Sequence, residues 1–209
     1  EMLDYAQNAD QTLLLSVCCS PEVAEVWKGR RMYFSTIHEG TQFHDRVLPE
    51  LFPGMPGLYA TGNVGNTAVQ IAAYMNASKV VLVGQDYGYT GNRMHCDDFS
   101  ECSVLDLSGE TITWARVPCE PNDDALQLRS GKVEVDGIST YNAFIEYRKS
   151  LHRIVEVNKI DLVNATEGGI LTDFPCRGLA EVIADLKAKG HEASGARALL
   201  AKALGEVRP

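Results

Sequence analysis

The chain has 209 residues, with 19 Lys and Arg against 28 Asp and Glu, so its formal net charge is −9. A hydrophobic share of 45% and a charged share of 22% are typical of globular proteins and exclude wholesale disorder or a fibrous repeat. The acidic balance, relieved only by a short basic cluster at residues 28–31, excludes a nucleic-acid groove. No apolar run approaches the roughly 18 residues of a membrane span, and the first residues do not resemble a signal peptide. We therefore expect a cytoplasmic protein that contacts no membrane.

The six cysteines form no CxxC pair, and a chain of this size needs no disulfides to build a core. We therefore expect reduced, mostly buried thiols. The adjacent Cys18 and Cys19 are predicted to pack at the end of a strand.

The N-terminal part of the chain alternates between strand and helix patterns. Apolar runs predict strands at residues 12–18 and 31–35, and a helix with proline in its first turn at 21–28. A long polar loop with His38 and His44 follows, and then a short helix at 46–52. Residues 57–91 predict a strand end at 58–61, a glycine loop, a helix at 68–75 capped by Asn66 or Thr67, and a strand at 79–83 buried on both faces. This pattern predicts one βαβ unit of a parallel sheet.

The remaining chain predicts an antiparallel insertion followed by further α/β structure. Short strands are expected at 104–107, 111–117, 126–129 and 132–135, within an insertion at about 103–137. A helix at 141–157, capped by Ser139 or Thr140, precedes a buried strand at 160–165 and helices at 177–189 and 191–204. The fold class is therefore α/β with a mainly parallel sheet. We expect one domain at 1–190 and a helical tail at 191–209.

Three predicted strand ends carry polar, glycine-rich loops at residues 61–67, 84–86 and 164–169. Ligands of open α/β sheets bind beyond the carboxyl ends of the strands, so these loops are expected to form one cleft. The first loop offers backbone N–H groups at a helix N-terminus to a phosphate or carboxylate, although its glycines could serve only to turn the chain. The predicted nucleotide or substrate contacts are Gly62, Asn63, Val64, Gly65, Asn66, Thr67, Gly84, Gln85, Asn164, Thr166, Glu167 and Gly168.

Asp86 and His95 are the predicted catalytic residues. Asp86 could bind a metal or sugar hydroxyls, or could simply cap a turn. His95 could act as a base or bind phosphate, or could be an exposed loop histidine without a role. Glu167 could contact substrate or cap the next turn. A zinc site built from His95, Cys96, Asp98 and Cys102 lacks regular ligand spacing and is not favoured.

These loops occur in the order of a known family. The blocks GNVGNTA at 62–68, VLVGQD at 81–86 and VNATEGG at 163–169, with His95 and a helix opened by Ser139 and Thr140, resemble the motility accessory factor (Maf) family. Maf lies within the DUF115 superfamily, also called 6-hydroxymethylpterin diphosphokinase MptE-like. The resemblance implies a Rossmann-like three-layer sandwich akin to bacterial sialyltransferases. Because the family's upstream glycine-rich loop is not seen here, we expect the N-terminal part of the domain to be missing.

The resemblance implies two alternative activities. A Maf-like glycosyltransferase would move a nonulosonic acid from a CMP-linked donor to a flagellin-type acceptor, with no metal. The loops would then hold phosphate or the sugar carboxylate, Asp86 would orient hydroxyls, and His95 would be the base or phosphate partner. An MptE-like diphosphokinase would move diphosphate from ATP to a hydroxymethylpterin, with Mg²⁺ held by Asp86 and by Glu167 or Asp97. A non-catalytic binding domain is the third possibility, and the oligomeric state stays open.

Overall fold

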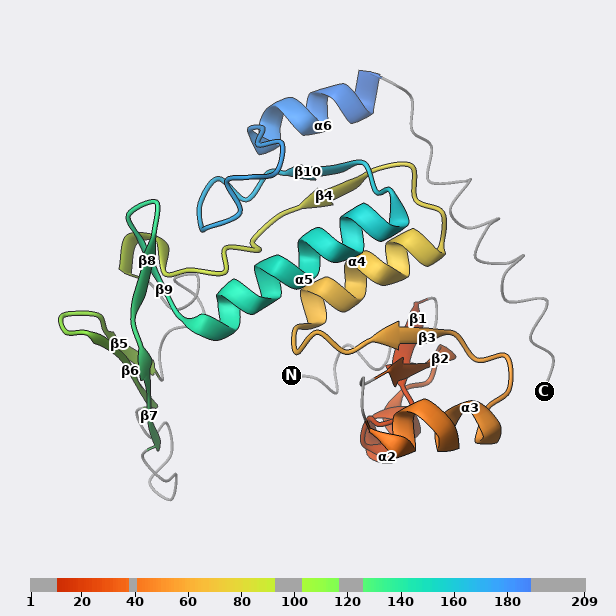
Figure 1. Ribbon diagram of the computed structural model, residues 1–209. Helices are drawn as coiled ribbons and strands as arrows, with labels where there is room; N and C mark the ends of the chain where they lie inside the picture. The colour runs from red at the N-terminus through yellow and green to blue at the C-terminus, as the bar shows by residue number, and fades with distance from the viewer. Residues whose placement is uncertain (1–10, 38–40, 93–102, 117–125, 189–209) are drawn as a thin grey trace. The chain divides into compact units, whose positions relative to one another are not determined.

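The computed structural model in Figure 1 describes residues 11–37, 41–92, 103–116 and 126–188. The chain divides into two compact units, Glu1–Ile71 and Ala72–Pro209, which are described separately below. Both units combine helices with short parallel sheets, and the second also contains small antiparallel sheets. The predicted α/β class is therefore confirmed, whereas the Rossmann-like sandwich stays a prediction.

A parallel sheet of three strands organises the first unit, in the order β1-β2-β3. Thr12 lies opposite Arg30, and Ser35 lies opposite Gly57. Apolar residues in each strand explain why the predicted strands form, since Leu15 and Leu58 are buried. The elements are β1 (Thr12–Ser16), α2 (Pro21–Val26), β2 (Arg30–Ile37), η1 (Phe43–Val47), α3 (Leu48–Leu51) and β3 (Gly57–Tyr59).

A side chain occupies the outer edge of β3. The backbone N–H of Tyr59 donates to Oε1 of Gln70, and Nε2 of Gln70 donates to the carbonyl of Tyr59, both at 2.9 Å. Gln70 is buried on α4 (Val64–Tyr74), and its amide satisfies the backbone groups that a neighbouring strand would otherwise pair. Strand β3 belongs to the sheet of β1 and β2, and the strand after α4 pairs with β10. The two strands lie in different units, so the predicted βαβ unit stays a prediction.

The second unit has a short parallel sheet made by β4 (Val80–Leu82) and β10 (Leu162–Asn164), with Leu162 opposite Val80. Every residue of β10 is buried, but Val83, which directly follows β4, is 53% exposed. The prediction that the 79–83 strand is covered on both faces is therefore wrong at its end. Helix α6 (Leu179–Ala188) packs on this sheet, as Figure 1 shows in blue. The packed residues are Val163, Ala165 and Val182, with Val81, Leu179 and Leu186 around them.

The antiparallel strands predicted in the insertion are confirmed. Strands β5 (Ser103–Asp106), β6 (Thr111–Arg116) and β7 (Leu126–Gly131) form one sheet. Strands β8 (Val133–Val135) and β9 (Ile138–Thr140) form a hairpin, whose turn residues Asp136 (φ 52°) and Gly137 (φ 77°) both have positive φ. Such pairs fit the tight turn that matches the twist of a hairpin.

Helix α5 (Asn142–Asn158) begins one residue later than predicted and is not capped by the predicted side chains. Ser139 and Thr140 belong to β9, so the N-cap position falls to Tyr141, which makes no side-chain cap hydrogen bond. Thr140 is fully buried and donates its hydroxyl to the carbonyl of Tyr87 at 2.7 Å. The Thr140 side chain therefore links the β8–β9 hairpin to the segment after β4 and does not cap α5.

An aromatic cluster joins the antiparallel sheet to α5. The indole of Trp114 donates to the hydroxyl of Tyr89 at 2.8 Å, and the Trp114 ring meets Tyr141 edge-on at 5.3 Å. Tyr141 lies 4.4 Å from Phe144 between ring centroids. Burial is the main cause that raises the pKa of Tyr87 to about 12, so its phenol stays protonated at neutral pH. The cluster thus positions the segment that carries Gly84, Gln85 and Asp86.

None of the helices in the described ranges has the length and apolar composition that a membrane span requires. The predicted helix at 191–204 and the tail at 191–209 lie outside the described residues.

Candidate functional site

The loops after β4 and β10 lie against each other at the carboxyl ends of these two strands. The parallel pairing continues past the strands, because the N–H of Ala165 donates to the carbonyl of Leu82 at 2.9 Å. The N–H of Gln85 then donates to Oγ1 of Thr166 at 3.2 Å, and the N–H of Ile170 donates to the carbonyl of Asp86 at 2.8 Å. The structure therefore brings together two of the three predicted loops, 84–86 and 164–169.

Two glycines allow this close approach. Gly169 has φ of 76°, and a Cβ added there would lie 2.0 Å from the carbonyl oxygen of Asp86. The N–H of Gly169 donates to Oγ1 of Thr90 at 2.8 Å. A Cβ on Gly168 would lie 3.4 Å from Oδ2 of Asp86, so the Asp86 carboxylate faces the second loop. Glycine is required at 169 because backbone lies where any side chain would begin.

Asn164 organises the second loop from within. Its side chain is buried, accepts the N–H of Thr166 at 3.0 Å through Oδ1, and donates from Nδ2 to the carbonyl of Leu171 at 3.1 Å. Its backbone N–H and carbonyl also bind the returning chain, at Pro175 and Arg177. The amide therefore holds the loop closed, and ligand contact by Asn164 stays a prediction.

Glu167 caps α6, as the alternative reading of the sequence allows. Its φ is 62°, and Oε1 accepts the N–H of Leu179, the first residue of α6, at 2.9 Å. A carboxylate at a helix N-terminus satisfies an unpaired N–H and interacts favourably with the helix dipole. This role fixes the start of α6 relative to the loop.

An open pocket of about 340 Å³ lies beside the second loop. The predicted 164–169 loop supplies four of its residues, and the other four come from the returning segment between Gly169 and α6, which the sequence does not identify. Arg177, which lines this pocket, forms ion pairs with Glu181 at 2.5 Å and Asp185 at 2.7 Å on α6. The lining residues are Asn164, Glu167, Gly168, Gly169, Thr172, Cys176, Arg177 and Gly178.

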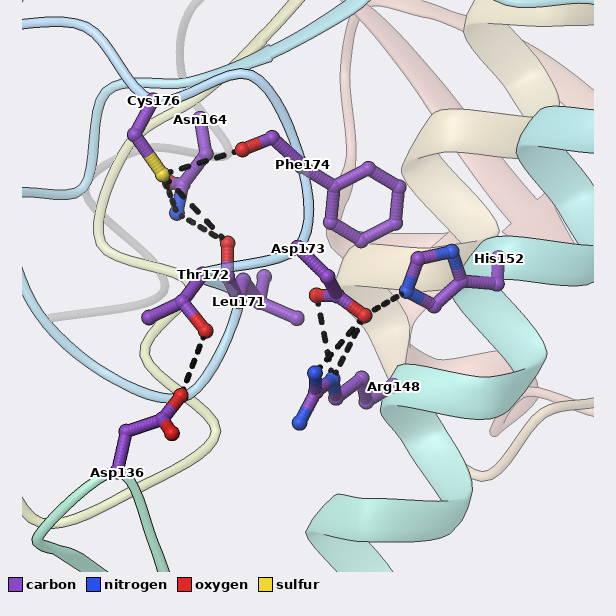
Figure 2. A network of polar contacts seen from close by, with 9 residues as sticks. All are labelled: Asp136, Arg148, His152, Asn164, Leu171, Thr172, Asp173, Phe174 and Cys176. Carbon is purple, nitrogen blue, oxygen red and sulfur yellow. Dashed lines mark hydrogen bonds and ion pairs between the residues drawn. The ribbon is translucent and has the colours of Figure 1, made fainter.

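Side-chain hydrogen bonds anchor the segment between Gly169 and α6 at two points (Figure 2). On one side, the hydroxyl of Thr172 donates to Oδ2 of Asp136, in the β8–β9 turn, at 2.8 Å. On the other side, Asp173 accepts hydrogen bonds from Nε of Arg148 at 3.2 and 3.1 Å and contacts Nε2 of His152, both on α5. The His152 ring stacks on Phe174 with centroids 4.1 Å apart. No local sequence pattern indicates this network, because its members are far apart along the chain.

Because Asp173 is charged, the stability that its contacts give the folded protein should depend on pH. Burial acts to raise the pKa of Asp173, but hydrogen bonds from Arg148 and His152 outweigh it and leave the pKa below its ordinary value. A carboxyl whose pKa is lower in the folded state stabilises the fold above its unfolded pKa of about 3.9, and this contribution is lost as the pH falls through the folded pKa. Denaturant unfolding should therefore show that Asp173→Asn destabilises the protein at pH 7 and makes less difference at pH 3.

Glu146→Gln provides the matched control for this prediction. Glu146 also lies in an ion pair of α5, with Lys149 at 2.7 Å, but both side chains are about two-thirds exposed, at 65% and 66%. Exposed pairs of this kind contribute about 0–1 kcal/mol. An Asp173→Asn variant that is no less stable than Glu146→Gln at pH 7 would contradict the role given to Asp173.

The predicted glycine loop at 62–67 lies in the first unit, and the N–H groups of residues 65–67 are already used. Oδ1 of Asn63 accepts the N–H of Gly65 at 2.5 Å and that of Asn66 at 3.4 Å. Asn63 therefore caps α4, which begins at Val64, so the predicted caps Asn66 and Thr67 and the predicted helix start at 68 are wrong. The free N–H groups predicted for anion binding are not found at 65 and 66. Val64 is 85% exposed and Asn66 is fully buried.

The remaining predicted site residues are not placed with the second loop. The 62–67 loop is described within its own unit, so the expected single cleft of three loops stays a prediction. His95 lies outside the described residues, as do Asp97 and the residues of the disfavoured zinc site. Among the described residues, no group of three or more His, Cys, Asp and Glu side chains could hold a metal ion.

A comparison with known protein families finds a match for the N-terminal part of the chain. Residues 1–92 match the family model described as 6-hydroxymethylpterin diphosphokinase MptE-like. This part of the chain is therefore similar to the MptE-like family. The match confirms the DUF115 side of the resemblance, while the narrower Maf assignment stays a prediction. The matched part contains the 62–67 loop and Asp86, whereas the pocket residues at 164–178 follow it. Comparisons with curated proteins and with solved structures gave no match.

Proposed function

We propose that the chain is a nucleotide-dependent transferase domain, whose ligand binds where the loops after β4 and β10 meet. The observation that carries this proposal is the pocket at the carboxyl ends of two parallel strands, with Asp86 beside Gly168 and with Arg177 on its lining. Parallel sheets bind their ligands at this end. A guanidinium binds phosphate or carboxylate oxygens.

Transfer of diphosphate from a nucleotide to a hydroxyl of a small acceptor is the activity that the family match favours. Such transfer depends mainly on positioning and on neutralising phosphate charge. Asp86 is the carboxylate that would hold Mg²⁺, which commonly takes one or two protein carboxylates together with substrate phosphates. The metal would supply charge neutralisation between the phosphates. Arg177 would bind the phosphate oxygens.

A Maf-like glycosyltransferase is the second candidate, and Arg177 at the pocket supports it. A nonulosonic acid carries a carboxylate, for which a guanidinium is a suitable partner. In this case Asp86 would orient sugar hydroxyls, the donor would be a CMP-linked sugar, and the acceptor a flagellin-type protein. His95 would take the proton from the acceptor hydroxyl as CMP leaves. Both candidates place the nucleotide-linked group at the same pocket.

Calorimetric titration of the whole chain with ATP and with CMP, each with and without Mg²⁺, tests the proposal. We expect ATP to bind only with Mg²⁺, and Asp86→Asn to weaken that binding roughly tenfold or more, equivalent to about 1.4 kcal/mol. Asp161→Asn is the matched control, because Asp161 precedes β10 at the opposite end of the same sheet and pairs with Lys79.

The possible outcomes separate the candidates. Metal-independent binding of CMP that survives in Asp86→Asn would favour the glycosyltransferase over the diphosphokinase. If Asp161→Asn weakens ATP binding as much as Asp86→Asn, the site is wrongly placed. If neither nucleotide binds, both transferase proposals fail, and the non-catalytic alternative replaces them.

A further inference from the structure

The adjacent cysteines of the first unit are both accessible. Cys18 and Cys19 are free and exposed, as is Cys176 in the second unit, so the prediction of mostly buried thiols is wrong for these three residues. The two cysteines directly follow Val17, just beyond the end of β1. They lie in the turn that connects β1 to α2, which begins at Pro21. Two adjacent, solvent-exposed thiols can be oxidised together, whereas a single buried thiol is inert.

Hydrogen bonds fix the turn that carries the pair. The N–H of Cys19 donates to the carbonyl of Ser16 at 2.9 Å, and the N–H of Cys18 donates to Oγ of Ser16 at 3.2 Å. The hydroxyl of Thr36, on β2, lies 3.8 Å from Sγ of Cys18 and donates toward it. The backbone of the pair and the Cys18 thiol are therefore held at the carboxyl end of two paired parallel strands.

We propose that Cys18 and Cys19 form a reversible redox site, which hydroperoxides convert to a disulfide between neighbouring residues. The thiolate of one cysteine attacks a peroxide oxygen, which gives a sulfenic acid and releases hydroxide or an alcohol. The second thiol attacks that sulfur, forms the S–S bond and releases water. In total, two thiols lose two electrons and two protons to one hydroperoxide, which leaves as water and water or alcohol.

The closeness of the two residues makes this disulfide easy to reduce. Consecutive Cα atoms are about 3.8 Å apart across a trans peptide, whereas ordinary disulfides join Cα atoms about 4.4–6.8 Å apart. The bond must therefore form with strain, and strained, exposed disulfides are the labile and regulatory ones. Closing the ring must also rearrange the turn held by Ser16, so the redox state changes the shape of this end of the sheet.

This inference does not depend on the proposed transferase activity. The test is peptide mapping by mass spectrometry of the whole reduced chain after limited treatment with hydrogen peroxide. We expect the peptide with Cys18 and Cys19 to lose the mass of two hydrogens, and dithiothreitol to restore it. Cys176→Ser, which keeps the pair and removes the other exposed thiol of the described residues, should form the Cys18–Cys19 disulfide to the same extent as the wild type.

Single replacement of either cysteine supplies the decisive comparison. Cys18→Ser and Cys19→Ser should lose the disulfide and accumulate sulfinic acid on the remaining thiol, because no second thiol traps the sulfenic acid. Both side chains are exposed, so serine should leave the fold intact, and a thermal unfolding curve confirms this. Sulfinic acid in the wild type at the same dose, disulfides to other cysteines or between chains, or no oxidation of the pair would each overturn the proposal.

Discussion

Replacement of Gly169 with alanine should cause the largest loss of stability among substitutions in the two meeting loops. The new Cβ would lie 2.0 Å from the carbonyl oxygen and 2.4 Å from Cα of Asp86, both of them backbone atoms. Backbone cannot yield as a flexible side chain can, so the loops must separate. We expect a loss of about 1–3 kcal/mol from overpacking, with about 1–2 kcal/mol more because an L-residue adopts positive φ there. Chemical denaturation of the whole chain measures the sum.

Gly137→Ala separates the two contributions. Gly137 in the β8–β9 turn has φ of 77°, close to the 76° of Gly169, but a Cβ there would meet nothing within 4 Å. It should therefore show only the conformational cost of about 1–2 kcal/mol. If the two alanine variants are equally stable, Asp86 does not lie against Gly169, and the description of the meeting loops is wrong.

Replacement of Asn164 with alanine should produce the second large effect. The substitution removes the acceptor of the Thr166 N–H and the donor to the Leu171 carbonyl at a buried position. Each buried polar group left without a partner costs about 1–3 kcal/mol. We therefore expect denaturation to show a loss of about 2–6 kcal/mol, the sum for the two groups.

Asn158→Ala is the matched control, because the residue type is the same but the side chain is exposed. Asn158 donates one hydrogen bond to the carbonyl of Ile154 within α5, at 2.8 Å. Water can replace that hydrogen bond, so we expect a loss of about 1 kcal/mol or less. An Asn164→Ala variant as stable as Asn158→Ala would contradict the structural role of Asn164 and leave ligand contact as its remaining explanation.

Most helices and strands could be predicted from sequence, because apolar spacing and local chain signals decide them. The runs at 12–18 and 160–165 predict β1 and β10, and the spacing of Phe144, Leu151 and Ile154 predicts α5. Helix starts were predicted less well. Asn63 caps α4 and not Asn66, since which of several nearby polar residues accepts the first N–H groups depends on the path of the incoming chain.

Sheet partners could not be predicted, because pairing depends on contacts between distant segments. The side-chain amide of Gln70 pairs with the backbone of Tyr59 at the edge of β3. No local sequence pattern indicates that a glutamine on a helix takes the place of a neighbouring strand. Hairpin strand β9 was missed for a similar reason. Ser139 and Thr140 have the composition of a helix cap, but Thr140 is buried and bonded to Tyr87.

The loops of the candidate site could be predicted from the sequence, but part of the pocket lining could not. Polar residues directly after β4 and β10 identified the loops that meet, because parallel strands bring their carboxyl ends to one edge. The pocket lining at Thr172, Cys176 and Arg177 could not be found this way, since it depends on the return path of the chain. That path is set by the contacts of Asp173 with Arg148 and His152 and by those of Asn164.

Backbone amide NMR of the whole chain, followed during addition of ATP with Mg²⁺, tests the central claim most directly. The account predicts that the largest shift changes fall on Gly84, Gln85 and Asp86 and on residues 164–178, where the two loops and the pocket lie. The antiparallel strands β5 and β6 should change little. Changes confined to those strands, or no changes at a saturating nucleotide concentration, would contradict a ligand site at the meeting of these loops.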